Sequence, residues 1–395
     1  MRLKANGKLC FVLPKGLLSG ISWFLARTLL AAKYHLEYIV VSYEPGANNF
    51  SESTSLSECL FVAQKIEKHS DNEETTFVTL LKKPKTSIEA IALANSIDGN
   101  KDRLVQAGES KAFLTKVSRE DLLDNLDNWG RFTFLPDVEI MDEVVSLLHG
   151  TLKIGSQNVK VPLVRFNNLI SSIGVDRHRF IDTFKIVNEN VPGAVRVLHG
   201  GEEAQRLTMN IAPNAYAMPV TENGKKIFQE VAGLLLIPDR IRIDTAHVVS
   251  LLSDTKVISN MFYAVNLKEE NIERLKALCL WFSTSWGLLT VLASREETEG
   301  AFVSIKQSQW RLLPVLSIDK LTRKQITKLA SVFDEFKDKL LSRIPEQFGS
   351  GGKVDDLRIE LDTAFLGVIG ITVEKDDLLL LYHEIGSSLK QWIGD

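Results

Sequence analysis

The sequence predicts an α/β domain, then a β-rich domain, then a helical segment at the C-terminal end. Three observations indicate this order. Apolar, β-branched runs mixed with helical periodicity occupy residues 1–127, short apolar runs broken by glycine and proline occupy 128–317, and residues 318–395 return to helical periodicity. A flexible break is expected at 349–352, where the sequence Gly-Ser-Gly-Gly interrupts the last segment.

The first apolar run, Leu9–Leu13, is short and bounded by a glycine and a proline, as in a central strand buried on both faces. The apolar residues that follow predict a helix through Leu30, and Ser19 or Ser22 can cap its start. Only a few polar residues precede the strand, so we expect its neighbours to lie upstream of this sequence. In this chain the strand should then leave an unpaired apolar edge, a surface for a partner or for aggregation.

Three more strands and two helices are expected in the α/β domain. β-Branched and aromatic residues favour strands at 36–43, 58–63 and 75–81. Because no helix separates the last two strands, we expect them to be antiparallel neighbours. Helical patterns at 87–95 and 121–126 predict helices on the outside of the domain.

Residues 128–317 alternate short strands with glycine and proline turns, which leaves long loops of the kind that carry recognition. Within this region, 275–292 predicts one long apolar helix. Residues 318–344 predict an amphipathic helix, and 354–392 a helical tail. Four tryptophans have apolar surroundings and are expected in the core: Trp129, Trp281, Trp286 and Trp310.

The composition limits the class of protein. A formal net charge of −3 excludes a chain that is basic throughout, but it allows a local basic face. No apolar run reaches about 18 residues and no signal-peptide pattern occurs, so we expect no membrane span. Cys10, Cys59 and Cys279 are widely spaced, which suits buried thiols in a reducing compartment. We therefore expect a cytoplasmic protein.

Three stretches, in this order, resemble the C-terminal half of an adenine-N6 DNA methyltransferase of the restriction–modification type, in which a target-recognition domain follows the catalytic domain. Residues 8–19 (KLCFVLPKGLLS) are similar to the strand and helix downstream of that family's catalytic loop. Residues 50–65 (FSESTSLSECLFVAQK) are similar to the loop and hairpin that end its sheet. Residues 278–287 (LCLWFSTSWG) through 311–315 (RLLPV) are similar to the end of the recognition domain.

The resemblance implies a partial methyltransferase sheet at 1–127, a DNA target-recognition domain at 128–317 and a helical segment at 318–395. The family binds S-adenosylmethionine at a glycine-rich turn and catalyses with an Asn/Asp-Pro-Pro-Tyr/Phe loop. This chain has no Pro-Pro pair and no Gly-x-Gly after an early strand. We therefore expect no catalytic residues and no methylation by this chain alone, with the cofactor on a partner half that binds it.

The resemblance also implies a role for Phe50. In the family an aromatic residue just before the hairpin strand stacks on the flipped target base, and Phe50 falls at that position. The alternative is that Phe50 anchors a loop rich in glycine and asparagine.

The recognition segment carries local positive charge. Between 151 and 250 twelve basic residues stand against nine acidic ones, within a chain of net negative charge. Arg177 and Arg179, and Arg240 and Arg242, are candidates for contact with double-stranded DNA, since arginine binds phosphate and pairs with guanine. The second pair shares one face if its run is a strand. Acidic neighbours offer plain surface ion pairs as the alternative.

Lys306 is a further candidate, because the resemblance implies contacts to the DNA backbone near this position, although a solvated surface lysine is the alternative. No metal site is expected, since His178 and His199 lack ligand-like spacing. The serine-rich loop at 51–57 lacks a Gly-x-Ser-x-Gly elbow, which argues against a hydrolase.

Two other classes of function remain open. One is a stand-alone DNA-binding specificity subunit, in which the α/β part is only a docking surface. The other is a protein-interaction module without nucleic acid that uses the amphipathic 318–344 helix. The target sequence and an associated nuclease cannot be read from this chain.

Overall fold

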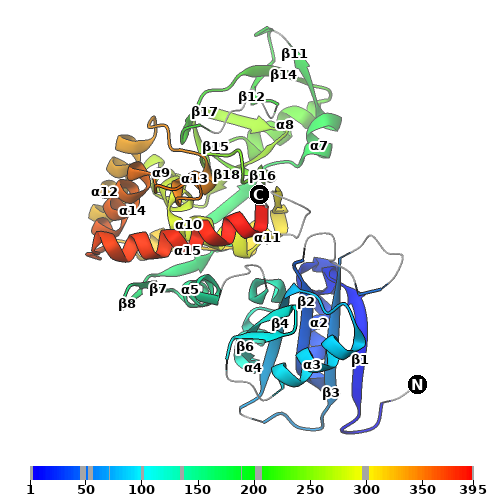
Figure 1. Cartoon of the computed structure of the whole chain (residues 1–395). Coiled ribbons are helices and arrows are strands. Elements are labelled where there is room, and N and C mark those ends of the chain that lie inside the picture. Colours follow the sequence, from blue (N-terminus) through cyan, green and yellow to red (C-terminus); the bar gives the residue numbers. More distant parts are fainter. Residues whose placement is uncertain are drawn as a thin grey trace. The chain divides into compact units, whose positions relative to one another are not determined.

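The computed structural model describes residues 3–44, 50–51, 57–70, 72–98, 102–133, 138–187, 189–200, 207–295 and 302–393. The chain divides into two compact units, 1–145 (unit 1) and 146–395 (unit 2). Unit 1 contains a six-stranded sheet, and unit 2 an eight-stranded sheet with most of the helices (Figure 1). The expected boundaries at 127/128 and 317/318 fall inside these units, and the division into three domains stays a prediction.

Unit 1 follows the expected mixture of strands and helices. Its elements are β1 (Lys8–Pro14), α1 (Gly16–Ser19), the 3-10 turn η1 (Ile21–Trp23), α2 (Phe24–Lys33), β2 (Tyr34–Ser42), β3 (Glu58–Lys65), β4 (Glu74–Lys82), α3 (Ser87–Ile97), β5 (Leu104–Ala107), β6 (Ser110–Ser118), α4 (Arg119–Asp124), η2 (Trp129–Phe132) and α5 (Val138–Leu148), which ends beyond the boundary of the unit.

The strand order of the unit 1 sheet is β1-β3-β2-β4-β6-β5. β3 is antiparallel to both β1 and β2, and β2 is parallel to β4. The expected pairing of β3 with β4 is therefore wrong, because β2 lies between them. The connection at 66–73 is long enough to cross β2, so strands that follow each other in sequence need not pair. The expectation of helices alone on the outside also missed β5 and β6, which are joined by a turn at Gly108 with φ +61°.

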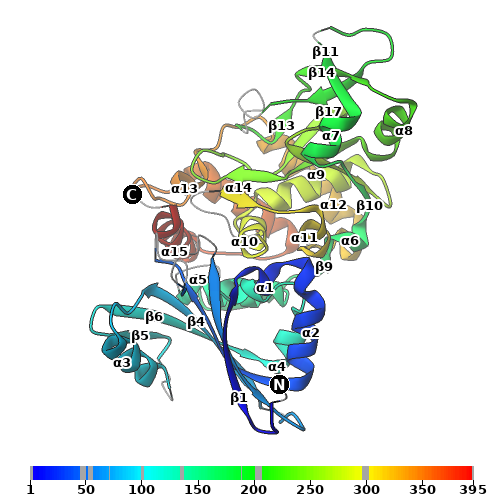
Figure 2. The same cartoon turned by 90° about the vertical axis from the view of Figure 1, so that its right-hand side faces the viewer.

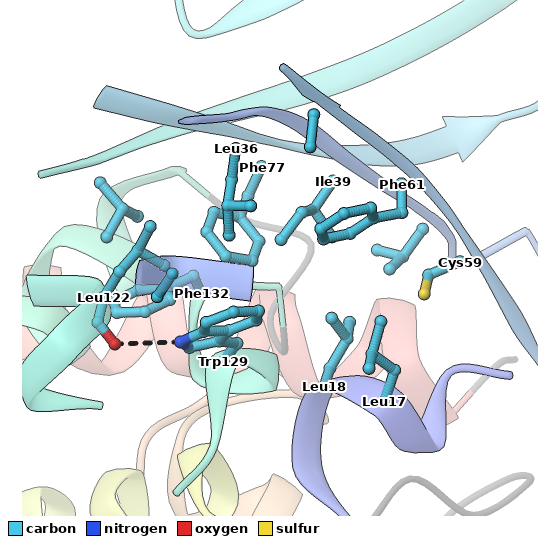
Figure 3. Close-up of a cluster of buried hydrophobic side chains, with 14 residues drawn as sticks. Leu17, Leu18, Leu36, Ile39, Cys59, Phe61, Phe77, Leu122, Trp129 and Phe132 are labelled. Carbon is cyan, nitrogen blue, oxygen red and sulfur yellow. Dashed lines mark hydrogen bonds between the residues drawn. The ribbon is translucent and has the colours of Figure 1, made fainter. Parts of the chain in front are cut away.

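Helices cover both faces of this sheet (Figure 2), with α3 on one side and α2 and α4 on the other. On the second side Leu17 and Leu18 of α1 pack with Phe61, and Trp129 lies nearby (Figure 3). The indole of Trp129 donates to the carbonyl oxygen of Leu122 at 3.0 Å and is fully buried, as expected from its apolar surroundings.

Arg27 ties the helical layer of unit 1 together. Its side chain is fully buried and donates to four carbonyl oxygens, those of Leu17 (2.7 Å), Gly20 (2.9 Å), Leu126 (2.6 Å) and Asp127 (3.0 Å). Burial lowers the pKa of Arg27 to about 10, although the Asp127 charge opposes the shift. The guanidinium thus satisfies carbonyls at the end of α1 and in the loop after α4, which would otherwise be buried without partners.

β1 forms an edge of the sheet, as expected, and its only strand partner among the described residues is β3. Phe11 is 55% exposed and Val12 42%, on opposite faces of the strand, so the prediction that this strand is buried on both faces is wrong. Nearby in the sequence, Leu25 and Leu29 of α2 are also largely exposed. α2 itself starts at Phe24 without a side-chain cap, so the predicted serine caps are wrong. Exposed apolar side chains on an edge strand are typical of a protein contact surface.

Unit 2 is built from many short elements. They are β7 (Thr151–Ile154), β8 (Gln157–Lys160), β9 (Leu163–Arg165), α6 (Phe166–Leu169), β10 (Ile170–Ile173), α7 (Arg177–Thr183), β11 (Phe184–Val187), β12 (Val195–Leu198), β13 (Asn210–Ile211), β14 (Ala215–Pro219), α8 (Glu222–Val231), β15 (Gly233–Pro238), β16 (Arg240–Arg242), β17 (Leu251–Ser259), β18 (Phe262–Leu267), α9 (Ile272–Ser283), α10 (Ser285–Ala293), β19 (Phe302–Ser304), α11 (Gln307–Leu312), β20 (Pro314–Leu316), η3 (Ile318–Lys320), α12 (Arg323–Phe336), α13 (Ile344–Gln347), α14 (Asp356–Ile369) and α15 (Lys375–Ile393).

The main sheet of unit 2 has the order β10-β18-β15-β17-β12-β14-β11, with β13 paired to β17. The predicted single helix at 275–292 is two helices, because Thr284 takes an extended backbone conformation and caps α10 through its hydroxyl group. Among the described residues no single helix is both long and apolar enough to cross a membrane. The pair α9 and α10, bent by 74°, is together long and apolar enough for such a span, but its apolar side chains are mostly buried in the core.

The C-terminal helices pack on this core rather than standing apart. α12 is shorter than the predicted 318–344 helix, and a capping box between Thr322 and Gln325 sets its start. Its apolar residues, such as Leu329 and Phe333, are buried, and the helix packs on α9 and α14 (Figure 1). The apolar face on which a helix-mediated interaction would depend is therefore already covered.

A buried polar cluster fastens these helices to the α9–α10 junction. Asp362 of α14 accepts hydrogen bonds from the backbone N–H and hydroxyl groups of Ser285, and from the hydroxyl of Tyr382 at 2.8 Å. Arg358 donates to Asp362, to the carbonyl oxygen of Ser283 and to the side chain of Gln347. Burial, with the nearby Asp362 charge, raises the pKa of Tyr382, so its phenol stays protonated and donates.

The cysteines are only partly as expected. Cys59 and Cys279 are buried, but Cys10 lies on the exposed β1 edge, where the prediction of a buried thiol is wrong. Burial raises the pKa of Cys279 to about 12, which keeps that thiol protonated.

Replacing Arg27 with alanine should destabilise unit 1 by about 4 kcal/mol, because four buried carbonyls lose a charged donor. Urea unfolding, together with hydrogen exchange of the α1 and α2 amides, measures this loss. Lys33→Ala on the exposed end of the same helix is the matched control and should change stability by less than about 0.5 kcal/mol. Equal effects of the two substitutions would contradict the role of Arg27.

Candidate nucleic-acid interface

Unit 2 contains a hollow of about 1050 Å³ with walls from four separate segments. The first turns of α7, residues 239–240, the start of β18 and residues 304–311 each contribute side chains to it. These segments are widely separated in the sequence, so the hollow exists only because strand pairing brings them together.

The pairing of β16 with β19 creates one side of the hollow. The two strands are antiparallel with Arg240 opposite Ser304, and the backbone N–H of Ile305 donates to the carbonyl oxygen of Asp239 at 3.1 Å. Because Ser304 lies opposite Arg240, Lys306, two residues after Ser304, is close to Arg240, and both side chains line the hollow. Ile241 between the arginines is buried, which leaves Arg240 and Arg242 on the exposed face, as predicted for a strand.

The α7 wall depends on a close backbone approach at Gly174. Its N–H donates to the carbonyl oxygen of Ala264 at 2.7 Å, and a Cβ atom at Gly174 would lie 2.7 Å from the Ala264 nitrogen. Only glycine fits this approach without displacement. Asp176 then caps α7 by accepting from the backbone N–H of Arg179 at 2.9 Å. Phe180 is buried, and the opposite helical face presents residues 177, 178 and 181 to the hollow.

The α11 wall is held by Trp310. Its indole is fully buried, donates to the carbonyl oxygen of Pro238 at 2.9 Å and packs edge-on against Phe166 and Phe282. Three other side chains of this helix line the hollow, those of Gln307, Ser308 and Arg311. The amide group of Gln307 donates to the carbonyl oxygen of Gly174, and Arg311 donates to the side-chain oxygen of Asn167 at 2.8 Å.

The hollow carries an excess of positive charge. Four cations line it, and the two carboxylates that also line it, Asp176 and Asp239, are engaged within the fold. Asp176 is the helix cap described above, and Asp239 accepts from the hydroxyl of Tyr263 at 2.8 Å. The cations are Arg177, Arg240, Lys306 and Arg311. A concave surface with this charge attracts anions, and phosphate groups bind well to such clusters.

The structure brings together three of the five predicted DNA-binding residues, Arg177, Arg240 and Lys306. The other two lie outside the hollow. Arg242 donates through Nε and Nη2 to Asp244 at 2.9 and 2.8 Å, and this hydrogen-bonded ion pair raises its pKa. Arg242 therefore forms the surface ion pair that was the alternative to DNA contact. Arg179 is exposed on α7 but does not line the hollow. Contact of these residues with DNA stays a prediction.

Sequence reasoning missed Gln307, Ser308 and Arg311. The signal was weak, because Trp310 was expected in the core and in a helix only Ser308 and Arg311 would turn away from its face, whereas Gln307, three residues before it, would not. What the sequence lacked was a reason to place a helix at 307–312 between two short strands.

Phe50 lies in unit 1 and is half-buried. It packs against the cluster of Val78, Leu80 and Leu93, and the ammonium group of Lys83 lies 5.2 Å from its ring centroid. The carboxylate of Glu58 accepts from the backbone N–H groups of Phe50 and Ser51 at 2.8 and 2.7 Å. Partial burial by itself would raise the pKa of Glu58, but the hydrogen bonds that its carboxylate accepts outweigh burial and lower the pKa. The neighbouring residues 45–49 lie outside the described residues, and they include Asn48 and Asn49, whose residue type favours a turn.

Within the parts of the chain that the structure describes, no group of three or more histidine, cysteine, aspartate or glutamate side chains could hold a metal ion. The chemistry that the hollow offers is hydrogen bonding and charge.

Comparison with known proteins gives structural likenesses alone. No protein-family model and no curated sequence matches the chain. It is similar to the type IIG restriction endonuclease BpuSI, at 13% identity and a TM-score of 0.38, over 98% of this chain and 48% of that one. It is also similar to the type IIL restriction-modification enzyme MmeI in complex with DNA, at 11% identity and a TM-score of 0.40, over 98% of this chain and 50% of that one. The chain thus spans about half the length of these two enzymes.

A further similar structure covers a smaller part of the chain. It is the methyltransferase subunit of a type I restriction-modification system from Streptococcus thermophilus, at 21% identity and a TM-score of 0.23, over 31% of this chain and 25% of that one. These likenesses do not by themselves assign a function to this chain.

Proposed function

We propose that this chain recognises and binds double-stranded DNA as the C-terminal part of a site-specific adenine-N6 DNA methyltransferase of the restriction–modification type. The observation that carries the proposal is the cationic hollow of unit 2. Three residues chosen from the sequence as DNA contacts, Arg177, Arg240 and Lys306, meet there from separate segments, together with Arg311. A row of aligned cations neutralises phosphates and releases counterions, which is the main source of affinity for duplex DNA.

Unit 1 supplies the remaining part of the proposal. The sequence lacks both the cofactor-binding turn and the Asn/Asp-Pro-Pro-Tyr/Phe loop, and methyl transfer to an exocyclic amine requires both. The chain is therefore not catalytic alone, and S-adenosylmethionine is bound by a partner that carries these motifs. That partner binds at the β1 edge, where β1 has no second strand partner among the described residues and Phe11 and Val12 are exposed on either side.

Phe50 is proposed to stack on the flipped adenine. Its backbone is fixed by Glu58, and a cation lies over its ring. Packing against the Val78 cluster also fits the alternative, in which Phe50 only anchors a loop. A stand-alone specificity subunit is a second candidate, and the same hollow favours it. Tight, sequence-selective binding without any partner would distinguish it.

The first test is a salt titration of duplex binding between about 50 and 200 mM. Wild-type affinity should fall steeply, and Arg240→Ala and Lys306→Ala should each lower the slope of log K against log salt by about one. Arg242→Ala is the matched comparison, since its guanidinium is paired with Asp244, and it should lower the slope less. Wild-type protein that does not bind DNA at the lowest salt would contradict the proposal.

The second test addresses the partner. Phe11→Lys should abolish co-purification of a protein that crosslinks to labelled S-adenosylmethionine, because a buried lysine would be unpaired in the joined sheet. Leu104→Lys is the control, since Leu104 is 47% exposed on β5 at the opposite edge of the same sheet, and it should leave the complex intact. Equal loss with both substitutions would argue against docking at β1.

The third test separates the two roles of Phe50. Phe50→Ala should leave binding to ordinary duplex unchanged but weaken binding to a duplex with an abasic position opposite the target adenine by about tenfold, since a stacking contact is lost. Equal loss of affinity for both duplexes would show that Phe50 has a structural role.

A further inference from the structure

The two helical walls of the unit 2 hollow differ in chemistry. We infer that the residues of α11 that line the hollow, Gln307, Ser308 and Arg311, read base edges and set the sequence preference, whereas Arg177, Arg240 and Lys306 contact phosphates. This inference rests on the proposed function, because it assigns parts to a surface that is first proposed to bind DNA.

The side chains of α11 have the groups that base recognition needs. An amide presents both a donor and an acceptor, and a guanidinium presents paired donors, so Gln and Arg can each bond two atoms of one base edge. The amide N–H of Gln307 donates to the carbonyl oxygen of Gly174, and its amide oxygen has no hydrogen-bond partner within the described residues. Arg311 donates through Nη1 to the side-chain oxygen of Asn167, and its guanidinium makes no other hydrogen bond within the described residues.

These groups are also held in place. Base readout requires side chains on a rigid support, since a shift of about 1 Å breaks a bidentate pair. Gln307 and Arg311 are half-buried and tethered to Gly174 and Asn167, on a helix fixed from behind by the buried Trp310. Arg177, Arg240 and Lys306 are exposed instead, which suits contact with phosphates along a backbone of uniform charge.

The opposite wall is less suited to the same readout. α7 presents Arg177, His178 and Ile181 to the hollow, and Ile181 is 59% exposed with no hydrogen-bonding group in its side chain. Arg177 and His178 also have groups that can bond a base edge, but both side chains are exposed and no hydrogen bond within the described residues holds them, so this wall lacks the fixed donors and acceptors that α11 presents.

Selection from a pool of randomised duplexes by the full chain tests the assignment. The wild type should enrich a defined sequence. Arg311→Ala and Gln307→Ala should each relax the preference at a different base position, with discrimination there falling about tenfold. Lys306→Ala, at the start of the same helix, is the matched control. It should keep the wild-type preference, weaken binding to all sequences by the same factor and lower the salt slope by about one.

A variant that removes the hydrogen-bond partner of Arg311 checks that the position of the Arg311 side chain, rather than the folding of the protein, is what changes the preference. Asn167→Ala removes no group assigned to DNA, yet it frees Arg311 and should relax the same base position as Arg311→Ala. A thermal melting point close to that of the wild type confirms that each variant folds.

The outcomes separate this inference from the proposed function. A wild type that binds duplex DNA with a preference that Arg311→Ala and Gln307→Ala both retain would overturn the assignment of α11 and leave the proposed function standing. A wild type that binds DNA with no preference would also overturn it. A wild type that binds no duplex at low salt would instead contradict the proposed function itself.

Discussion

The hydrogen bond from the buried indole of Trp310 to the carbonyl oxygen of Pro238 joins the end of β15 to α11 inside the core of unit 2. Phe166 and Phe282 pack on the same ring and add α6 and α9 to the junction. The next residue after Pro238 is Asp239, whose carbonyl accepts from Ile305, so one cluster fixes both β16 and the start of α11. Every cation of the hollow except Arg177 is carried by these two segments, and the hollow therefore depends on an apolar junction behind it.

The two units use buried polar groups in the same way, as ties between segments that also pack through apolar side chains. In unit 1 the Arg27 guanidinium bonds four backbone carbonyls from two separate stretches. In unit 2 Asp362 joins Ser285 to Tyr382, and Arg358 adds Ser283 and Gln347. A buried charge is costly unless its hydrogen bonds are satisfied, so each of these groups favours one arrangement over its alternatives. Such rigidity suits a protein whose proposed work is recognition.

The strands β1 to β4 were predictable because their apolar and β-branched runs are continuous, and those runs depend only on local sequence. Their pairing was not. β2 lies between β3 and β4 because a connection at 66–73 allows it, and no local pattern reports which edges meet. The 275–292 helix was predicted as one element since its residues are apolar throughout, yet Thr284 breaks it by capping α10. Of the site residues, Arg177, Arg240 and Lys306 were chosen by residue type, while Gln307 and Arg311 had no local signal strong enough to select them.

The sequence by itself determined which side chains this protein has for recognition. It contains the cations and aromatic side chains of the proposed recognition surface, and the cofactor and catalytic motifs of the family that it resembles do not occur in it. The tertiary structure alone decided which of those cations act together. Arg177, Arg240 and Lys306 converge because β16 pairs with β19 and Gly174 lies against Ala264, whereas Arg242, two residues from Arg240, turns to Asp244 instead. Residue type is a local property, but convergence depends on strand register over long sequence separations, which no short pattern encodes.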